Sequence, residues 1–176
     1  MAFRGVAGQI ATGVSVVVTL ADGEPLATTV GSVVAASWDP PLLAVFLRAG
    51  SRLEAALDGS HRFTVNVLGE ADHGLARRFA QRGRAQGWAA LAGVPLLRRD
   101  PAPPAFACAV AWVDCAVVQS IPIGDHRCFV SEVLDADRDA GAPPLIYYRG
   151  RFRRLGTAVA PAGWVRPGIV DLAAVW

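Results

Sequence analysis

The stretch Pro25–Pro41, PLATTVGSVVAASWDPP, decides the fold that we expect for this chain. It carries no charge from Pro25 to Trp38, is rich in Thr, Ser, Val and Ala, and stops at Asp39-Pro40-Pro41. Small side chains let another surface approach the backbone closely, and the hydroxyl groups add uncharged donors and acceptors. The stretch therefore predicts a strand that lines a site for a flat, polar-edged ligand. The alternative is a buried β-strand that tolerates its hydroxyls.

The composition around this stretch is that of one globular domain. The chain has 176 residues, of which 53% are hydrophobic and 18% charged, which excludes a disordered chain. A chain of this length typically buries about 70% of its extended surface in a single core. We expect a domain over residues 1–155 and an apolar tail over 156–176 that packs on the barrel or on a partner subunit. The net charge of +2 gives no field for nucleic acid, and every cationic side chain is arginine.

Three cysteines, Cys108, Cys115 and Cys128, form no CxxC motif and fit a reducing compartment better than a disulfide framework. The run Gly5–Ala21 imitates a signal peptide only loosely, because polar residues interrupt it. We therefore expect a cytoplasmic protein with no membrane segment. His126 and the cysteines lack a specific metal-ligand spacing, so no metal site is predicted.

Strand and hairpin patterns flank the organising stretch. Val14–Leu20 is rich in β-branched residues and predicts a strand. Ala21–Glu24 contains Asp-Gly, a strong hairpin signal, so the organising stretch returns as the partner strand. Leu42–Leu47 is a continuous apolar run, typical of a strand buried on both faces. Arg62–Leu68 alternates apolar and polar residues and predicts a strand with one buried face.

Short helices and further strands complete the prediction. Ser51 and Glu54 have capping-box spacing, which predicts a helix through Leu57 that Asp58-Gly59-Ser60 ends. Two further helices are expected over Phe3–Ala11 and Ala71–Gln81, and an irregular surface excursion over Gly83–Phe106. The remaining strands are expected over Ala107–Ile121, His126–Ala136, Pro144–Tyr148 and Arg151–Leu155. This pattern predicts a mainly β protein, a closed or partly open antiparallel barrel with a few short helices. The apolar residues of His126–Ala136 point to both sides, which favours a dimer.

The residues alone point to one candidate for chemistry. His126 follows Gly124-Asp125 at a turn, where a histidine can be an acid, a hydrogen-bond donor or a conformational brace. No nucleophile–base pair, Walker loop, GxGxxG or HExxH motif is present.

Several segments together resemble the short-chain flavin reductase family, which has the FMN-binding split-barrel fold. They are FRGVAGQIATGVSVVVT, LATTVGSVVAASWDPP, RFTVNVL, LARRFA, IGDH and PLIYYRGRFRRL, and they occur in the family's order over Phe3–Leu155. The resemblance implies a homodimer that binds FMN or FAD between barrel and partner. It also implies an NAD(P)H:flavin oxidoreductase that takes hydride from NADH or NADPH and supplies reduced flavin to a separate monooxygenase.

The resemblance also implies roles for individual residues. Thr29, Ser32 and Ser37 would lie along the isoalloxazine and ribityl chain, and His126 on the nicotinamide side. The phosphate end would meet Arg48, Ser51 and Arg52, with Phe79 near the flavin groove. The predicted cofactor-binding residues are thus Thr28, Thr29, Gly31, Ser32, Ala35, Ser37, Arg48, Ser51, Arg52 and Phe79, and the predicted catalytic residue is His126.

Four positions depart from the family pattern. Gly31 stands where the family has Asn, Ala35 where it has the first Ser of S-V-S, and Ala27 and Thr28 where it has Gly and Met. Each lost polar side chain removes roughly 0.5–1.5 kcal/mol of hydrogen bonding. Two alternatives therefore stay open: a flavin-binding or ligand-binding split barrel used as a tailoring enzyme, and a cofactor-free dimeric subunit.

Overall fold

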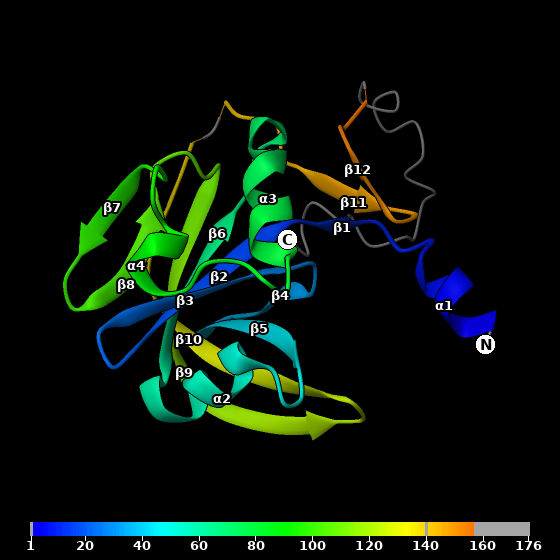
Figure 1. Ribbon diagram of the computed structural model, residues 1–176. Coiled ribbons are helices and arrows are strands. Elements are labelled where there is room, and N and C mark those ends of the chain that lie inside the picture. Colours follow the sequence, from blue (N-terminus) through cyan, green and yellow to red (C-terminus); the bar gives the residue numbers. More distant parts are fainter. Residues whose placement is uncertain (1, 140, 157–176) are drawn as a thin grey trace.

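The computed structural model describes residues 2–139 and 141–156, and their main feature is a curled seven-stranded antiparallel sheet (Figure 1). The strand order in this sheet is β3-β2-β6-β9-β10-β5-β4. The strands are β2 (Ser15–Ala21), β3 (Glu24–Val30), β4 (Val33–Trp38), β5 (Pro41–Arg48), β6 (Arg62–Val67), β9 (Ala111–Ile123) and β10 (His126–Arg138). The predicted mainly β class is confirmed.

The organising stretch is not one strand but two, at opposite edges of this sheet. β3 pairs with β2 and β4 pairs with β5, yet only Gly31 and Ser32 separate β3 from β4. The sheet must therefore curl until its edges approach, and because no pairing joins β3 to β4 among the described residues, the barrel stays split. The prediction of a single partner strand was wrong because Ser32 is held by β5: its hydroxyl donates to the carbonyl of Phe46 at 2.8 Å.

Two hydrophobic clusters lie on the two faces of β2. Val17 points into the barrel, where it packs in a cluster with Val45, Phe63 and Phe129. Val16 and Val18 point outward into a second cluster, which includes Phe79 and Phe106. Burial on both faces explains why the valine run of β2 does not alternate with polar residues.

The helices differ from the expected ranges at their ends. α1 (Ala2–Ala7) is shorter than predicted, and α3 (His73–Ala80) follows a 3₁₀ turn, η1 (Glu70–Asp72). The Ser51 cap is confirmed, because its side chain accepts from the amide of Glu54. α2 (Arg52–Ser60), however, continues past Leu57 and includes Asp58, Gly59 and Ser60. Its C-cap is His61, which adopts a left-handed conformation and donates its amide to the Leu57 carbonyl at 3.1 Å. The prediction that Asp58-Gly59-Ser60 ends this helix was wrong.

The segment predicted as an irregular surface excursion is ordered and partly buried. It contains α4 (Gly87–Ala90), β7 (Leu96–Arg99) and β8 (Ala102–Phe106), and every residue of β8 is buried. β8 lies over β6: the Thr64 hydroxyl donates to the Pro103 carbonyl at 2.8 Å, and the Asn66 side chain accepts from the Phe106 amide at 2.6 Å. β6 is therefore buried on both faces rather than one. Prolines suit β8 because it pairs with β7 alone.

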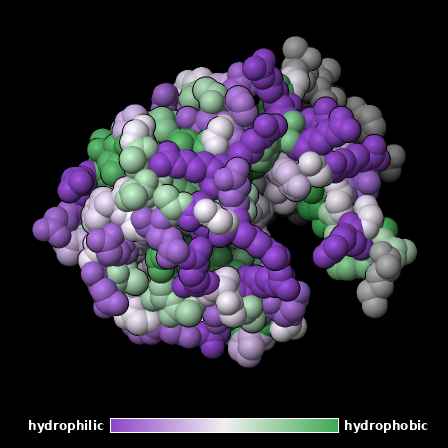
Figure 2. Space-filling model, viewed as in Figure 1, coloured by the Kyte–Doolittle hydropathy of each residue, from purple (hydrophilic) through white to green (hydrophobic). Residues whose placement is uncertain are grey.

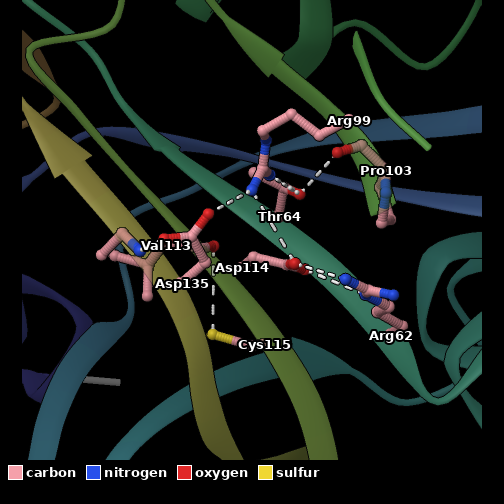
Figure 3. Close-up of polar contacts among 9 residues, drawn as sticks. Arg62, Thr64, Arg99, Pro103, Val113, Asp114, Cys115 and Asp135 are labelled. Carbon is pink, nitrogen blue, oxygen red and sulfur yellow. Dashed lines mark hydrogen bonds and ion pairs between the residues drawn. The ribbon is translucent and has the colours of Figure 1, made fainter. Parts of the chain in front are cut away.

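An ion-pair network lies under the β7–β8 hairpin (Figure 3). Asp114 of β9, 2% exposed, accepts two hydrogen bonds from Arg62, at 2.6 and 3.2 Å. Arg99 of β7 lies 3.8 Å from Asp114 and 3.4 Å from Asp135, and its guanidinium stacks 3.8 Å from the centre of the Trp112 ring. We call Arg62, Arg99, Asp114 and Asp135 the Asp114 network.

A second, three-stranded sheet stands beside the barrel and contains β1 (Thr12–Gly13), β11 (Ile146–Tyr148) and β12 (Arg151–Arg153). Arg149 and Gly150, both with positive φ, make the turn between β11 and β12. The tail predicted to pack as an apolar segment lies outside the described residues from position 157 on. No helix within the described residues has the length and hydrophobicity needed to cross a bilayer.

Candidate functional site

A cleft of about 530 Å³ opens between the end of β5, the start of α2 and the segment that follows α3. We call it the arginine cleft. Its lining residues are Thr28, Arg48, Ala49, Gly50, Ser51, Arg52, Arg82 and Arg84. Four of the predicted cofactor-binding residues, Thr28, Arg48, Ser51 and Arg52, are thus brought together. Arg82 and Arg84 were assigned to no site by the sequence.

Arg84 is fixed at the edge of β3 by a set of hydrogen bonds. Its guanidinium donates to the Ala27 carbonyl at 2.7 and 3.0 Å, to the Thr28 hydroxyl at 2.7 Å, and to the Gln81 carbonyl at 2.8 Å. None of these partners is charged. Burial and then the nearby charge of Arg52 lower the pKa of Arg84. The site therefore holds a half-buried cation beside a second cation.

Among the residues that the structure describes, no carboxylate lines the arginine cleft. Arg48, Arg52 and Arg82 are exposed and make no ion pair with any described residue. The Glu54 carboxylate, on α2, forms an ion pair with Arg127 at 3.2 Å and accepts a hydrogen bond from the Gly50 amide. Unneutralised guanidinium groups in a concave site attract anions and match phosphate oxygens with paired N–H groups.

The predicted catalytic residue, His126, lies beside this cleft. In the β10–β5 register His126 is directly opposite Arg48. Its Nδ1 is 2.8 Å from Asp125 Oδ1, and the ring is 45% exposed. The hydrogen bond and charge of His126 lower the pKa of Asp125, with a smaller contribution from Arg48. The Ala49 amide donates to the Asp125 carbonyl at 3.0 Å, which joins the β9–β10 turn to the cleft rim.

A second, more apolar pocket of about 190 Å³ adjoins β3. We call it the β3 pocket. Its lining residues are Val14, Thr29, Val30, Gly31, Ala80, Tyr147 and Phe152. Thr28 lines the arginine cleft and Thr29 lines the β3 pocket, so neighbouring residues of one edge strand contribute to both cavities.

Among the other predicted residues, Thr29 lines the β3 pocket, whereas Ser32, Ala35, Ser37 and Phe79 line neither cavity. The hydroxyl of Thr29 donates to the Ala76 carbonyl at 2.8 Å, and that of Ser32 to the Phe46 carbonyl, so both can only accept from a ligand. Phe79 is fully buried and stacks near Phe106, with ring centres 5.8 Å apart. Ala35 and Ser37 lie on β4 and line neither cavity.

Gly31 is explained by the approach of β1. A Cβ at this position would lie 2.9 Å from Thr12 Oγ1, so any larger residue would push that side chain aside. Where the family has Asn, this chain has Gly31, and the Thr12 hydroxyl fills part of the space that a side chain at position 31 would need. Among the residues that the structure describes, no group of three or more His, Cys, Asp or Glu is arranged to hold a metal ion.

The fold and the two cavities define the class of this protein: a split antiparallel barrel with a cationic cleft at one edge strand. Residues 7–156 match the family model of the flavin reductase like domain. The chain therefore belongs to the flavin reductase-like family. This confirms the predicted family and fold, and with them the prediction of a flavin reductase.

Relatives and solved structures agree with this assignment. The chain is 38% identical over 150 residues, covering 85% of this chain and 78% of the relative, to the reductase component of 4-nitrophenol 4-monooxygenase/4-nitrocatechol 2-monooxygenase from Rhodococcus opacus. It is 33% identical to an NADH-dependent FAD reductase from Streptomyces globisporus, covering 86% and 83% of the two chains. BorF, the flavin reductase component of a bacterial two-component tryptophan halogenase, superposes with a TM-score of 0.82 at 32% identity, covering 88% of this chain and 96% of BorF.

Proposed function

We propose that this chain reduces FAD or FMN with NADH or NADPH where the arginine cleft meets the β3 pocket, and supplies the reduced flavin to a partner monooxygenase. The observation that carries this proposal is the placement of a cationic cleft and an apolar pocket on one edge strand, β3. A flavin nucleotide has the same two parts, an aromatic ring system and a phosphate end. The names of relatives, which include NADH-dependent FMN and FAD reductases, support the same activity.

The residues present fit a flavin at both ends. Arg48, Ser51 and Arg52 at the junction of β5 and α2 would hold the phosphate through charge-assisted hydrogen bonds. Thr29 and Gly31 would lie against the ring in the β3 pocket. Ser37 and Ala35 stay predicted ring neighbours on β4, and Phe79 would act from the core by supporting α3.

The bound flavin supplies the redox chemistry, and the chain binds and orients it. The edge strand β3 pairs on one side only, so its outward backbone groups, apart from the Ala27 carbonyl that Arg84 occupies, are available to a ring that lies alongside. This arrangement needs no dedicated nucleophile or general base. His126, held by Asp125 next to Arg48, would contact the nicotinamide nucleotide and orient it toward the ring.

The proposed active form is a homodimer. Apolar side chains stay exposed on β4, β9 and β10, on the segment after α1, and on α1 itself, which Figure 2 shows standing apart from the body of the molecule. These exposed residues are Phe3, Val6, Ile10, Val34, Trp38, Val118, Ile121, Ile123 and Leu134. A second copy that covers them would remove a large apolar area from water and would complete the groove beside β3.

The test is oxidation of NADH or NADPH by the purified chain with added FAD or FMN, followed at the nicotinamide absorbance. We expect turnover, a slower nicotinamide-dependent step in His126→Ala, and unchanged rates in Arg77→Gln, which removes an exposed arginine outside both cavities. Tight flavin binding without turnover would instead favour the flavin-binding alternative. A protein that neither binds nor reduces flavin would contradict the proposal. Sedimentation of the same sample tests the homodimer.

A further inference from the structure

We propose that Arg127 and Glu54 are positioning residues for the reductase site, because their ion pair holds the turn between β5 and α2 in the shape that forms the arginine cleft. We call this turn, residues 48–51, the β5–α2 turn. The inference rests on the proposed function and deepens it. Neither Arg127 nor Glu54 is among the residues that line the arginine cleft or the β3 pocket, so both act through the turn.

The β5–α2 turn is a part of the site that needs to be held in place. All four of its residues, Arg48, Ala49, Gly50 and Ser51, line the arginine cleft. The first three are exposed, Ser51 is half-buried, and Gly50 has a positive φ of 75°. Exposed backbone with few packed side chains opens locally at low cost. The shape of the cleft therefore depends on what fastens this turn.

Glu54 fastens the turn from the start of α2. Its Oε2 accepts a hydrogen bond from the Gly50 amide at 3.2 Å, and its own amide donates to the Ser51 side chain at 3.3 Å. The Glu54 side chain is only 12% exposed, so water screens its charge weakly. Its second carboxylate oxygen, Oε1, points to a different partner.

That partner is Arg127 of β10. Its Nη1 lies 3.2 Å from Glu54 Oε1 and donates to both carboxylate oxygens of Asp58, one helical turn further along α2, at 2.5 and 2.6 Å. The same guanidinium lies 5.9 Å from the centre of the Phe129 ring, which belongs to the barrel core. Arg127 therefore ties the beginning of α2 to β10 at the end of the barrel (Figure 1).

The place of Arg127 in β10 joins this tie to the nicotinamide side of the proposed site. Arg127 directly follows His126, which lies opposite Arg48 in the β10–β5 register. The Ala49 amide donates to the Asp125 carbonyl at 3.0 Å. The β5–α2 turn is thus fastened to the start of β10 by one backbone hydrogen bond and one ion pair. Loss of the ion pair should leave the turn held by the weaker, neutral contact.

α2 itself has a separate anchor. Leu53 and Leu57 are buried in the cluster inside the barrel, and they hold the helix whether or not Arg127 is present. Breaking the ion pair should therefore loosen the β5–α2 turn more than the helix or the barrel. This difference separates a positioning role from a contribution to stability alone.

Hydrogen exchange of the ligand-free chain, followed by NMR, tests the positioning directly. Arg127→Gln should speed exchange of the Gly50 amide about fivefold, which corresponds to about 1 kcal/mol. Amides of the central strand β2, which report on opening of the barrel, should keep their rates. Asp135→Asn, which breaks an ion pair of Arg99 outside both cavities, is the matched control and should leave Gly50 unchanged.

Two substitutions of Glu54 test whether its carboxylate acts through Gly50. Glu54→Gln keeps an acceptor for the Gly50 amide but loses the ion pair, whereas Glu54→Ala loses both. Exchange of the Gly50 amide should therefore be faster in Glu54→Ala than in Glu54→Gln. Equal rates in the two variants would overturn the role of Glu54. Arg127→Lys, which keeps the charge but not the planar donor set, should restore slow exchange only in part.

The consequence for the site is measured by titration with FAD and, independently of flavin, with inorganic phosphate. Arg127→Gln should weaken both ligands about fivefold, the same change that the loosened turn shows in exchange. In turnover the variant should raise the KM for flavin and leave kcat nearly unchanged, because the side chain touches no reacting atom. Asp135→Asn should change none of these values.

Unchanged exchange at Gly50 in Arg127→Gln would overturn the inference. Equally faster exchange in the turn and in β2 would also overturn it, because the ion pair would then be structural alone. Faster exchange at Gly50 with unchanged affinity for FAD and phosphate would show that the turn does not set the site, with the same consequence. A chain that reduces no flavin would refute the proposed function, while exchange and phosphate titration would still decide the roles of Arg127 and Glu54.

Discussion

Arginine has opposite surroundings in two regions of this molecule. In the Asp114 network, Arg62 and Arg99 meet the buried carboxylate of Asp114, and Arg99 also reaches Asp135. In the arginine cleft, four guanidinium groups line one cavity, and no carboxylate from the described part of the chain lines it. The network joins β6, β7, β9 and β10 beneath a hairpin, whereas the cleft opens to solvent along β3.

The difference separates structural charge from functional charge. A paired, buried charge stabilises the fold only as long as its partner remains, because an uncompensated charge in the interior is costly. Cations left together without a partner gain little for the fold, since they repel each other. An anion that binds between them offsets this electrostatic repulsion. The network should therefore control stability, and the cleft should control ligand affinity.

The largest effect is expected where the network is broken. Asp114→Asn leaves Arg62 and Arg99 without their buried counter-charge and should lower the free energy of unfolding by roughly 3 kcal/mol. Denaturant unfolding measures this loss. Asp135→Asn, at an exposed partner of Arg99, is the matched control and should cost less than about 1 kcal/mol. Equal, small losses in both variants would show that the network is not structural.

The next effect is expected in the cleft and on binding. Arg52→Gln removes one charge-assisted contact and should raise the flavin dissociation constant about tenfold or more. The free energy of unfolding should stay the same or rise, because Arg84 loses its repulsive neighbour. Flavin titration and denaturant unfolding of one preparation give both values. A destabilised Arg52→Gln variant with normal flavin affinity would contradict this, because it would make the charge of Arg52 structural.

A smaller effect is expected at Thr29, where structure and binding overlap. Thr29→Ala removes the hydrogen bond to the Ala76 carbonyl and should cost about 1 kcal/mol of stability. Flavin affinity should fall only a few-fold, because the hydroxyl donor is already used within the protein. Thr29→Ser, which keeps the hydroxyl, should restore most of both values. Titration at a temperature where both variants are folded separates the two effects.

The smallest effect at neutral pH concerns Cys115, next to Asp114. Burial, and then the charge of Asp114, raise the pKa of this thiol from 9.0 to about 12. Because the pKa is higher in the folded state, stability is unaffected below about pH 9 and falls as the pH rises from 9 toward 12. Alkylation of the native protein at pH 9 should therefore spare Cys115 and reach the half-exposed Cys108 first. Rapid labelling of Cys115 would contradict its buried, protonated state.

Local signals in the sequence predicted local structure correctly. Asp22 and Gly23 form the expected hairpin turn with positive φ angles, and Ser51 caps α2. The order of short motifs also identified the family, because the motifs fall on successive strands, turns and helices of the fold. These features depend on residues close together in the chain.

Long-range features escaped prediction. Nothing local indicates that β8, with its prolines, would lie buried over β6, or that the chain would pass from one sheet edge to the other at Gly31. The sequence assigned Arg82 and Arg84 to no site. Only the fold brings them into one cleft with Arg48 and Arg52. The one signal in the sequence that could have identified them is that no acidic residue stands close to them in the chain.

A crystal structure of the chain grown with FAD tests the central claim most directly. The account predicts that the phosphates lie in the arginine cleft, with Arg48 and Arg52 on one side and Arg82 on the other. It predicts that the ring system lies along β3. Phosphates bound outside the arginine cleft, with the ring away from β3, would contradict it.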